Sequence, residues 1–127
     1  MVVRRVAVIA RECGALLVVD NTFTPLVLRP AALGADIVVH HHPHTLQGVE
    51  TFEGAMIAYS MGNFIFPGMY LTEYGEESML LRVGYADERV RYVELVPVRI
   101  DHQTISVDTS DGALDRVLTA TRRLNAE

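Results

Sequence analysis

The sequence predicts an α/β fold in which a parallel βαβ front half is followed by antiparallel hairpins and a C-terminal helix. Two aliphatic runs, ALLVV at 15–19 and ADIVV at 35–39, each follow a helical pattern. Continuous runs of this kind are typical of parallel strands buried on both faces. Two segments, 45–66 and 78–100, then carry longer β-prone runs separated by turn residues. An amphipathic pattern near the C-terminus predicts the last helix.

The composition restricts the kind of protein that this chain can be. At 127 residues, 50% of them hydrophobic, it is long enough for one globular domain over 1–127. A net charge of −5 without a basic run makes nucleic acid an unexpected partner. Because no run approaches the roughly 18 apolar residues of a membrane span and no secretory leader pattern is present, we expect a cytoplasmic protein without a membrane span.

The front half begins with a helical pattern over residues 3–13, and Gly14 follows where a helix C-cap is expected. The apolar positions at helical spacing are Val3, Val6, Ala10 and Cys13. The run 25–34 predicts a short helical connection that is interrupted by proline and ends at Gly34. The order of helix, strand, helix and strand is that of a right-handed parallel crossover.

Cys13 is the single cysteine. No internal disulfide and no multi-cysteine zinc site can therefore form within this chain. We expect its side chain to pack at the end of the first helix. A nucleophilic role is not favoured, because no activating partner is adjacent in the sequence.

The back half carries two hairpin signals. Glu53-Gly54 separates two β-prone runs, and residues 86–88 separate two longer ones. The first arm of the second hairpin alternates its apolar residues onto one face, namely Met79, Leu81, Val83 and Tyr85. Its second arm changes phase near Tyr92-Val93, which predicts a bulge.

The remaining elements are predicted from single residues and short patterns. Pro97 predicts an edge strand or a strand end. Ser110 and Asp111 are candidate N-caps for the last helix. One face of that helix carries Leu114, Val117, Leu118, Thr121 and Leu124. Tyr59, Phe64 and Phe66 are most simply core or sheet residues.

Four histidines fall within five positions, in the run HHHPH at 40–44. Pro43 biases His42 toward extended geometry, so His42 and His44 can point to the same side of the backbone. The pair follows the carboxyl end of a buried strand, where open α/β sheets place their ligands. Imidazole is the side chain that most often binds zinc, manganese or iron ions at neutral pH.

Two other interpretations of the histidine cluster stay open, a solvated loop and an adventitious nickel or zinc chelator. A catalytic dinuclear site also needs carboxylates and an amide oxygen. The candidates are Asp20, Asn21, Asp36, Glu50 and Glu53. The sequence does not place them relative to the histidines.

From about residue 35 to the end, the chain carries GAD, HHPHTLQGVE, AYSMGNFIF and VELVPVRI. These motifs resemble the C-terminal part of the CapA-like proteins of capsule and poly-γ-glutamate synthesis, a family with a calcineurin-like metallophosphoesterase fold. The resemblance implies that His42 and His44 hold the positions of a metal-binding His-x-His pair, with His41 beside them. It places Asn63 in a loop near the site and implies a divalent metal of the zinc or manganese class.

The same resemblance implies a chemistry and shows one departure. Any reaction would be hydrolysis of a phosphate ester or a role in poly-γ-glutamate assembly, with a metal-activated water as nucleophile and a histidine as proton donor. His40 is the departure, because the family usually has a glycine there to make the turn. By its neighbours alone, Asn63 is more simply a turn residue.

Within residues 4–40, the run IARECGALLVVDNTFTPLVLRPAALGADIVVH resembles the pyridoxal-phosphate enzymes of cysteine and methionine metabolism, the cystathionine synthase and lyase group. The resemblance implies that Asp20 holds the position of the aspartate that pairs with the cofactor's pyridine nitrogen. The run is one residue shorter than the family pattern around NTFTP. The chain contains no lysine, and imine formation needs an amine. No pyridoxal phosphate is therefore expected, and Asp20 is a vestigial position.

Because both families contain a GAD-aliphatic strand, we interpret the chain as a splice joined at residues 34–40. The splice leaves out the upstream ligand motifs of the CapA-like fold, so the metal site is expected to be incomplete, and no catalytic residue is assigned. Two hypotheses remain. In the first, His41, His42 and His44 hold a divalent ion in a metal-binding domain with weak or no phosphoesterase activity. In the second, the chain is a catalytically silent scaffold or interaction domain, and the histidines are loop residues. A fragment of a sulfur amino-acid enzyme is a remote alternative. An exposed edge of the truncated sheet predicts a homodimer.

Overall fold

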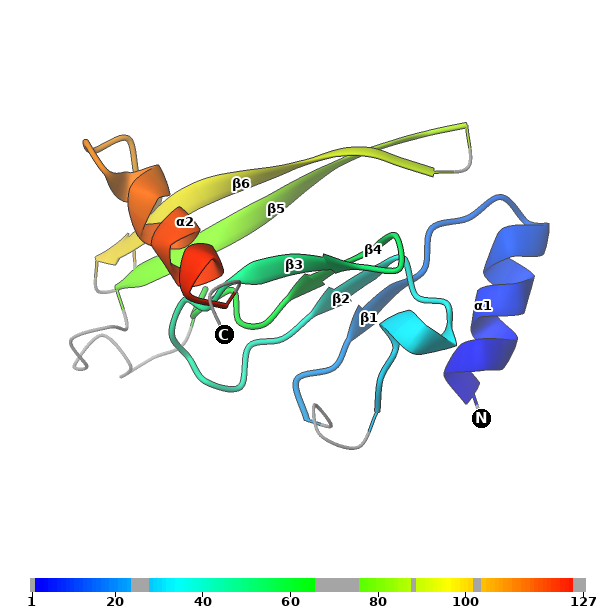
Figure 1. The fold of residues 1–127 in the computed structure, drawn as a ribbon. Coiled ribbons are helices and arrows are strands. Elements are labelled where there is room, and N and C mark those ends of the chain that lie inside the picture. Colours follow the sequence, from blue (N-terminus) through cyan, green and yellow to red (C-terminus); the bar gives the residue numbers. More distant parts are fainter. Residues whose placement is uncertain (1, 24–27, 66–75, 88, 102–103, 125–127) are drawn as a thin grey trace.

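The computed structural model describes residues 2–23, 28–65, 76–87, 89–101 and 104–124. Figure 1 shows a small mixed sheet beside a long β-hairpin, with a helix near each end of the chain. In chain order the elements are α1 (Val2–Glu12), β1 (Val18–Asp20), the 3-10 helix η1 (Ala31–Leu33), β2 (Ile37–Val39), β3 (Val49–Phe52), β4 (Ala55–Ala58), β5 (Glu77–Ala86), β6 (Arg89–Asp101), β7 (Thr104–Val107) and α2 (Ala113–Leu124).

The first sheet has the order β1-β2-β4-β3. β1, β2 and β4 are parallel, and β3 pairs with β4 in antiparallel fashion. The predicted parallel front half is therefore confirmed. Burial on both faces is correct for β2, where Ile37 and Val38 are buried, but wrong for β1, where Val18 is 52% exposed. The physical reason is that β1 forms an edge of the sheet and lacks a neighbour on one side.

The β3–β4 hairpin turns at the predicted residues. Glu53 and Gly54 have φ angles of 49° and 86°, and two consecutive residues with positive φ form the tight turn whose twist matches that of the paired strands. Phe52 pairs with Ala55 across this turn. The dipeptide signal in the sequence was therefore sufficient to find the hairpin.

The second sheet has the order β5-β6-β7, and its strands are all antiparallel. Gly84 pairs with Tyr92 and Tyr85 pairs with Val90, so Arg91 is the extra residue of a bulge. The phase change predicted near Tyr92 is confirmed at this bulge. A side chain at Gly84 would collide with the ring of Tyr92. The turn of this hairpin includes residue 88, which lies outside the described residues.

The sequence predicted that Pro97 marks an edge strand or a strand end, and this prediction is wrong. It lies inside β6, the central strand of its sheet, opposite Met79. The carbonyl of Pro97 accepts a hydrogen bond from the amide of Asp108, on the β7 side. Because N–H and C=O of one residue point to the same side in an antiparallel pair, the missing N–H removes no bond to β5. The proline sits where the pairing with β7 ends, next to Val98.

The main core lies between the two sheets and α2. Its fully buried members are Ala58 of β4, Met79 of β5 and Val117 of α2. Figure 1 shows α2 lying beside β6 and the end of β3, with which it makes contacts. The helix predicted at the C-terminus is confirmed, but Leu114 is 48% exposed rather than on the packed face. The side chains of Thr121 and Leu124, and residue 66, lie outside the described part of the chain.

α1 forms as predicted but packs through a different residue. Ala7 is its buried residue, whereas Val6 is 41% exposed and Cys13 is exposed just beyond the helix. The prediction that Cys13 packs at the helix end is therefore wrong. The helix contacts η1, and a side-chain carbon at Gly34 would lie 3.0 Å from Cβ of Ala7. Because α1 packs through the single buried residue Ala7, the other apolar residues of its face stay exposed.

The two faces of the first sheet have different surroundings. Residues on one face, such as Val39 and Val49, pack on the main core. The alternate residues of the same strands point to the opposite face. There η1 contacts β4, and a cavity opens beside it. Among the described residues, no helix is both long and apolar enough to span a bilayer.

Candidate functional site

The histidine loop, residues 40–44, leaves the carboxyl end of β2 and is held against the chain that follows β4. The amide of His40 donates to the carbonyl of Ala58 at 3.1 Å, and the carbonyl of His40 accepts from the amide of Met61 at 3.0 Å. His40 is 8% exposed. Among the described residues the non-glycine positions with positive φ do not include His40. The bulky side chain therefore causes no backbone strain at the position where a glycine was expected.

The turn of the loop spans His41–His44 and does not lie at His40, where the family usually has its glycine. The amide of His44 donates to the carbonyl of His41 at 2.9 Å, and His44 has a φ of 57°. The simple alternation on which a same-side His42–His44 pair was predicted therefore does not continue through His44. His42 is exposed and His44 is half-buried. His41 and His44 instead lie at the two ends of one turn and are joined by a backbone hydrogen bond.

Both of these rings are held by a second segment, Gly62-Asn63. His41 Nδ1 lies 3.2 Å from the carbonyl oxygen of Gly62, and His44 Nδ1 lies 2.7 Å from Oδ1 of Asn63. Carbonyl and amide oxygens only accept hydrogen bonds, so in each ring Nδ1 carries the proton. The basic lone pair of each neutral ring is then on Nε2. Metal-binding histidines are oriented in this way, by a bond from the other ring nitrogen to an oxygen.

The segment that orients the histidines is itself fixed by β5. Gly62 bridges to Ser78, and Ser78 Oγ donates to the carbonyl of Met61 at 2.8 Å. Gly62 has a φ of 77°, and a Cβ there would lie 2.7 Å from the carbonyl oxygen of Glu77. Only glycine fits this backbone and this close approach. Asn63, predicted as a loop residue near the site, is 5% exposed and contacts the histidine loop.

The structure does not assemble a full ligand set around these rings. Among the described residues, no group of three or more His, Cys, Asp or Glu side chains could hold a metal ion. Asp36 accepts a hydrogen bond from the amide of Leu17 at the opposite end of β2, and Glu53 lies in the β3–β4 turn. Nδ2 of the buried Asn63 has no hydrogen-bond partner within the described part of the chain. The residues present thus fit an oriented pair of histidines and not a closed metal site.

The strand end after β1 is organised locally. Asp20 Oδ1 accepts hydrogen bonds from the amide and the hydroxyl of Thr22, at 2.9 and 2.5 Å. The Thr22 hydroxyl, followed by its amide and the charges of His41 and His40, holds the pKa of Asp20 below its usual value despite an opposing effect of burial. Asn21 is buried and its Nδ2 donates to the carbonyl of Leu28. Both residues therefore stabilise the strand end.

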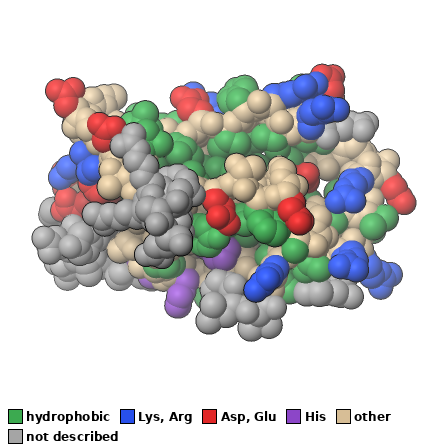
Figure 2. Space-filling model, in the orientation of Figure 1, with side chains coloured by type: hydrophobic (Ala, Val, Ile, Leu, Met, Phe, Trp, Pro, Cys, Tyr) green, Lys and Arg blue, Asp and Glu red, His purple; other side chains and the backbone are tan. Residues whose placement is uncertain are grey.

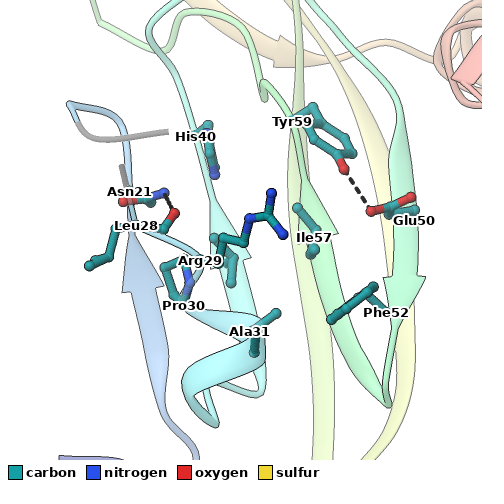
Figure 3. Close-up of a pocket in the computed structure, with 12 residues that line it drawn as sticks. Asn21, Leu28, Arg29, Pro30, Ala31, His40, Glu50, Phe52, Ile57 and Tyr59 are labelled. Carbon is teal, nitrogen blue, oxygen red and sulfur yellow. Dashed lines mark hydrogen bonds between the residues drawn. The ribbon is translucent and has the colours of Figure 1, made fainter. Parts of the chain in front are cut away.

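A cavity of about 340 Å³ lies on the face of the sheet opposite the main core. Figure 3 shows alternate residues of three strands on its floor and the segment 28–32 along one side. It is lined by Asn21, Leu28, Arg29, Pro30, Ala31, Ala32, Val38, His40, Glu50, Phe52, Ile57 and Tyr59. The hydroxyl of Tyr59 donates to Oε1 of Glu50 at 2.6 Å. This bond, with burial and the carboxylate charge, raises the pKa of Tyr59 to about 12.

His40 forms one wall of this cavity. Its ring centroid lies 6.3 Å from that of Tyr59, and the two rings are tilted by 47°. Burial lowers the pKa of His40 below its usual value, while the charge of Asp20 acts in the opposite direction. No sequence pattern indicated this cavity, because its residues come from five separate segments. On the face shown in Figure 2, acidic and basic side chains are interspersed, and histidine side chains lie at the lower surface.

Comparison with known proteins matches residues 21–68 to a family model described as a bacterial capsule synthesis protein, PGA_cap. The chain is 31% identical over 97 residues to the capsule biosynthesis protein CapA of Bacillus anthracis. The match covers 64% of this chain and 23% of that protein. The matched segment contains β2, the histidine loop and Asn63.

A second set of relatives comes from sulfur amino-acid metabolism. The chain is 68% identical over 31 residues to a methionine gamma-lyase of Arabidopsis thaliana, covering 24% of this chain and 7% of that protein. It is 35% identical over 108 residues to the cystathionine beta-lyase MetC of Staphylococcus haemolyticus, covering 84% of this chain and 27% of that protein. The chain resembles two families.

The extents of these matches differ from those inferred from the motifs. The capsule-type match begins at residue 21 rather than at about 35. The longer lyase match covers 84% of the chain, so it continues well past residue 40. The two similarities therefore overlap around β2. The chain spans no more than 27% of the length of these curated relatives.

Proposed function

We propose that this chain is a CapA-like partial domain that binds one divalent cation weakly through the histidine loop and does not hydrolyse phosphate esters. One observation carries the proposal: the rings of His41 and His44 are both oriented by oxygen atoms of Gly62-Asn63. The matched capsule-synthesis segment contains all four of these residues. A bound zinc or manganese ion would supply Lewis acidity at this point.

His41 and His44 are the proposed ligands, each through Nε2. Their Nδ1–H groups are committed to oxygens on the neighbouring segment, which sets the tautomer that a metal needs. His42 is exposed and makes no hydrogen bond through its ring among the described residues. It therefore serves as a matched control, because it lies in the same loop and carries the same side chain.

The small number of ligands supports the proposed lack of catalysis. Catalytic metal sites combine at least three protein ligands with a bound water whose position is fixed. Within the described part of the chain, carboxylates do not join the two histidines to make such a set. Two neutral imidazoles can retain an ion, but they leave its geometry largely to water.

The experiment is a calorimetric titration of the purified, tag-free chain with zinc and manganese. We expect one-to-one zinc binding with a Kd of about 10 to 100 μM, or roughly −5.5 to −7 kcal/mol. His41→Ala and His44→Ala should each weaken binding about tenfold, the lower part of the range for disturbed metal sites. His42→Ala should change the affinity less than about twofold, since His42 is not one of the two proposed ligands.

Two outcomes would contradict this proposal. Equal losses in His41→Ala, His42→Ala and His44→Ala would mean that the loop is an unspecific chelator and that the chain is a silent scaffold. Metal-dependent hydrolysis of a phosphate ester by the wild-type chain, lost in His44→Ala, would mean that a complete site exists.

A further inference from the structure

The cavity on the second face of the first sheet is a separate feature from the histidine loop. Its floor is formed by Val38 of β2, Ile57 of β4 and Phe52 of β3. Leu28 and Pro30 line it from the segment that precedes η1. The walls are thus predominantly apolar, with a few polar groups, which is the usual character of small-molecule sites. Its volume of about 340 Å³ is at the lower end of the range of roughly 300 to 1,000 Å³ for such sites.

Two opposite charges face this cavity from different segments. Arg29 comes from the stretch before η1, and Figure 3 shows its guanidinium extending into the space between His40 on one side and Tyr59 and Glu50 on the other. Glu50 comes from β3. Within the part of the chain that the structure describes, the guanidinium of Arg29 forms no ion pair, and Glu50 contacts the hydroxyl of Tyr59 instead.

The bond from Tyr59 fixes where the negative charge is presented. Oε1 of Glu50 accepts the hydroxyl hydrogen at 2.6 Å, which restricts the rotation of the carboxylate and leaves Oε2 available as an acceptor. Tyr59 is neutral at physiological pH, since its pKa is about 12. The cavity therefore offers one cationic donor and one anionic acceptor, held apart on an apolar floor.

We propose that this cavity binds a small zwitterion, with its carboxylate on Arg29, its ammonium on Glu50 and its hydrocarbon part on Phe52 and Ile57. A guanidinium pairs well with a carboxylate because its planar fork matches the two oxygens. A ligand with only one of the two charges would leave the other protein charge partly desolvated without a partner, which is unfavourable. The inference does not depend on metal binding by the histidine loop.

The test uses four probes of matched size in the presence of EDTA, so that no cation on the histidine loop contributes. Norleucine and its ω-amino isomer aminocaproate are zwitterions with short and long charge separation. Hexanoate and hexylamine carry one charge each. Calorimetry should give a Kd of about 1 mM for the better zwitterion. Both singly charged probes should bind about fivefold more weakly, the effect of losing one partly exposed ion pair.

The variants separate a binding role from a structural one. Arg29→Gln should bind the zwitterion no better than it binds hexylamine, and Glu50→Gln should bind it no better than it binds hexanoate. The matched controls are Arg82→Gln and Glu94→Gln, because these residues form an exposed ion pair on the other sheet. These controls should retain the wild-type preference. A melting temperature equal to that of the wild type shows that each variant is folded.

Three results would overturn the proposal. The first is that none of the four probes binds the folded wild-type chain at concentrations about tenfold above the expected Kd. The second is that both zwitterions bind no more tightly than hexanoate or hexylamine. The third is that folded Arg29→Gln keeps the wild-type preference for the zwitterion over hexylamine.

Discussion

The loops that follow β1 and β2 differ in what holds their polar side chains. After β1, Asp20 is bonded to Thr22, only two residues away. After β2, the rings of His41 and His44 are held by Gly62 and Asn63, 21 and 19 residues away. The first arrangement is a local turn that a short peptide can form. The second exists only when β2, β4 and β5 have come together.

This difference shows which loop has a geometry suited to binding. A side chain bonded to its own neighbours has its capacity for hydrogen bonds largely used in shaping the backbone. A ring that is bonded through Nδ1 to another segment has its direction set by the fold. Substitutions at Gly62, Asn63 and Asp20 act on these two loops, whereas the pH dependence of Tyr59 reports on the cavity face of the first sheet.

The largest effect is expected for Gly62→Ala. Positive φ at Gly62 and the 2.7 Å approach of a Cβ to the carbonyl of Glu77 should reduce the free energy of unfolding by about 2 to 4 kcal/mol. Urea denaturation measures this loss. Gly54→Ala is the matched control, because Gly54 has a φ of 86° with no atom within 4 Å of the added carbon. Equal losses in the two variants would mean that β5 does not clamp the loop.

The next effect is expected for Asn63→Ala, which removes the oxygen that orients His44. Zinc affinity should fall about tenfold, and the free energy of unfolding should fall by about 1 kcal/mol. Asn63→Asp should retain zinc affinity, since a carboxylate accepts the same Nδ1–H bond. Calorimetry on both variants decides the point. Loss of affinity in Asn63→Asp would contradict an orienting role.

A smaller effect is expected when the pH is raised, and it concerns Tyr59 on the cavity face of the first sheet. Folding raises the pKa of Tyr59 from 10.0 to about 12, so the unfolded chain loses this proton first as pH rises. Stability from the Tyr59–Glu50 bond is therefore complete below pH 10 and is lost as pH rises toward 12. Urea midpoints should fall across this range, and the fall should be smaller in Tyr59→Phe. An unchanged pH profile in Tyr59→Phe would show that another group is responsible.

The smallest effect is expected for Asp20→Ala, at about 0.5 to 1 kcal/mol, because the turn is exposed and local. The folded pKa of Asp20 is lowered, so its contribution is present at neutral pH and is lost as pH falls below the usual range of a carboxyl group. Zinc affinity should stay within about twofold of the wild type. A larger loss of zinc affinity would show that Asp20 belongs to the metal site.

Sequence patterns found most of the fold where the determinants are local. Glu53-Gly54 predicted the β3–β4 hairpin, because a two-residue turn with positive φ depends on those two residues alone. The prediction from Pro97 was wrong, because the cost of a missing N–H depends on which neighbouring strand the position faces and on where the pairing with that strand ends. The prediction that the strand containing Val18 is buried on both faces was wrong for a related reason. Whether an aliphatic strand is central or at an edge depends on the strand order.

The candidate site was predicted only in part. The capsule-type resemblance named His41, His42 and His44 as metal ligands and singled out Asn63, but it gave no reason to choose His41 and His44 over His42. That choice follows from the turn at His44 and from the oxygens of residues 62–63. Arg29 was not singled out at all, because a lone arginine in a connection carries no pattern until a cavity forms around it.

The sequence by itself determined the strands and helices of local origin, the absence of a Schiff-base lysine and the resemblance to two families. The tertiary structure decided which histidine rings are oriented together, which strand is an edge and where a cavity joins Arg29 to Glu50. The physical reason is the range of the interactions. Hydrophobic period and turn chemistry act over a few residues, whereas the orientation of a ring requires a partner atom that only folding brings within about 3 Å.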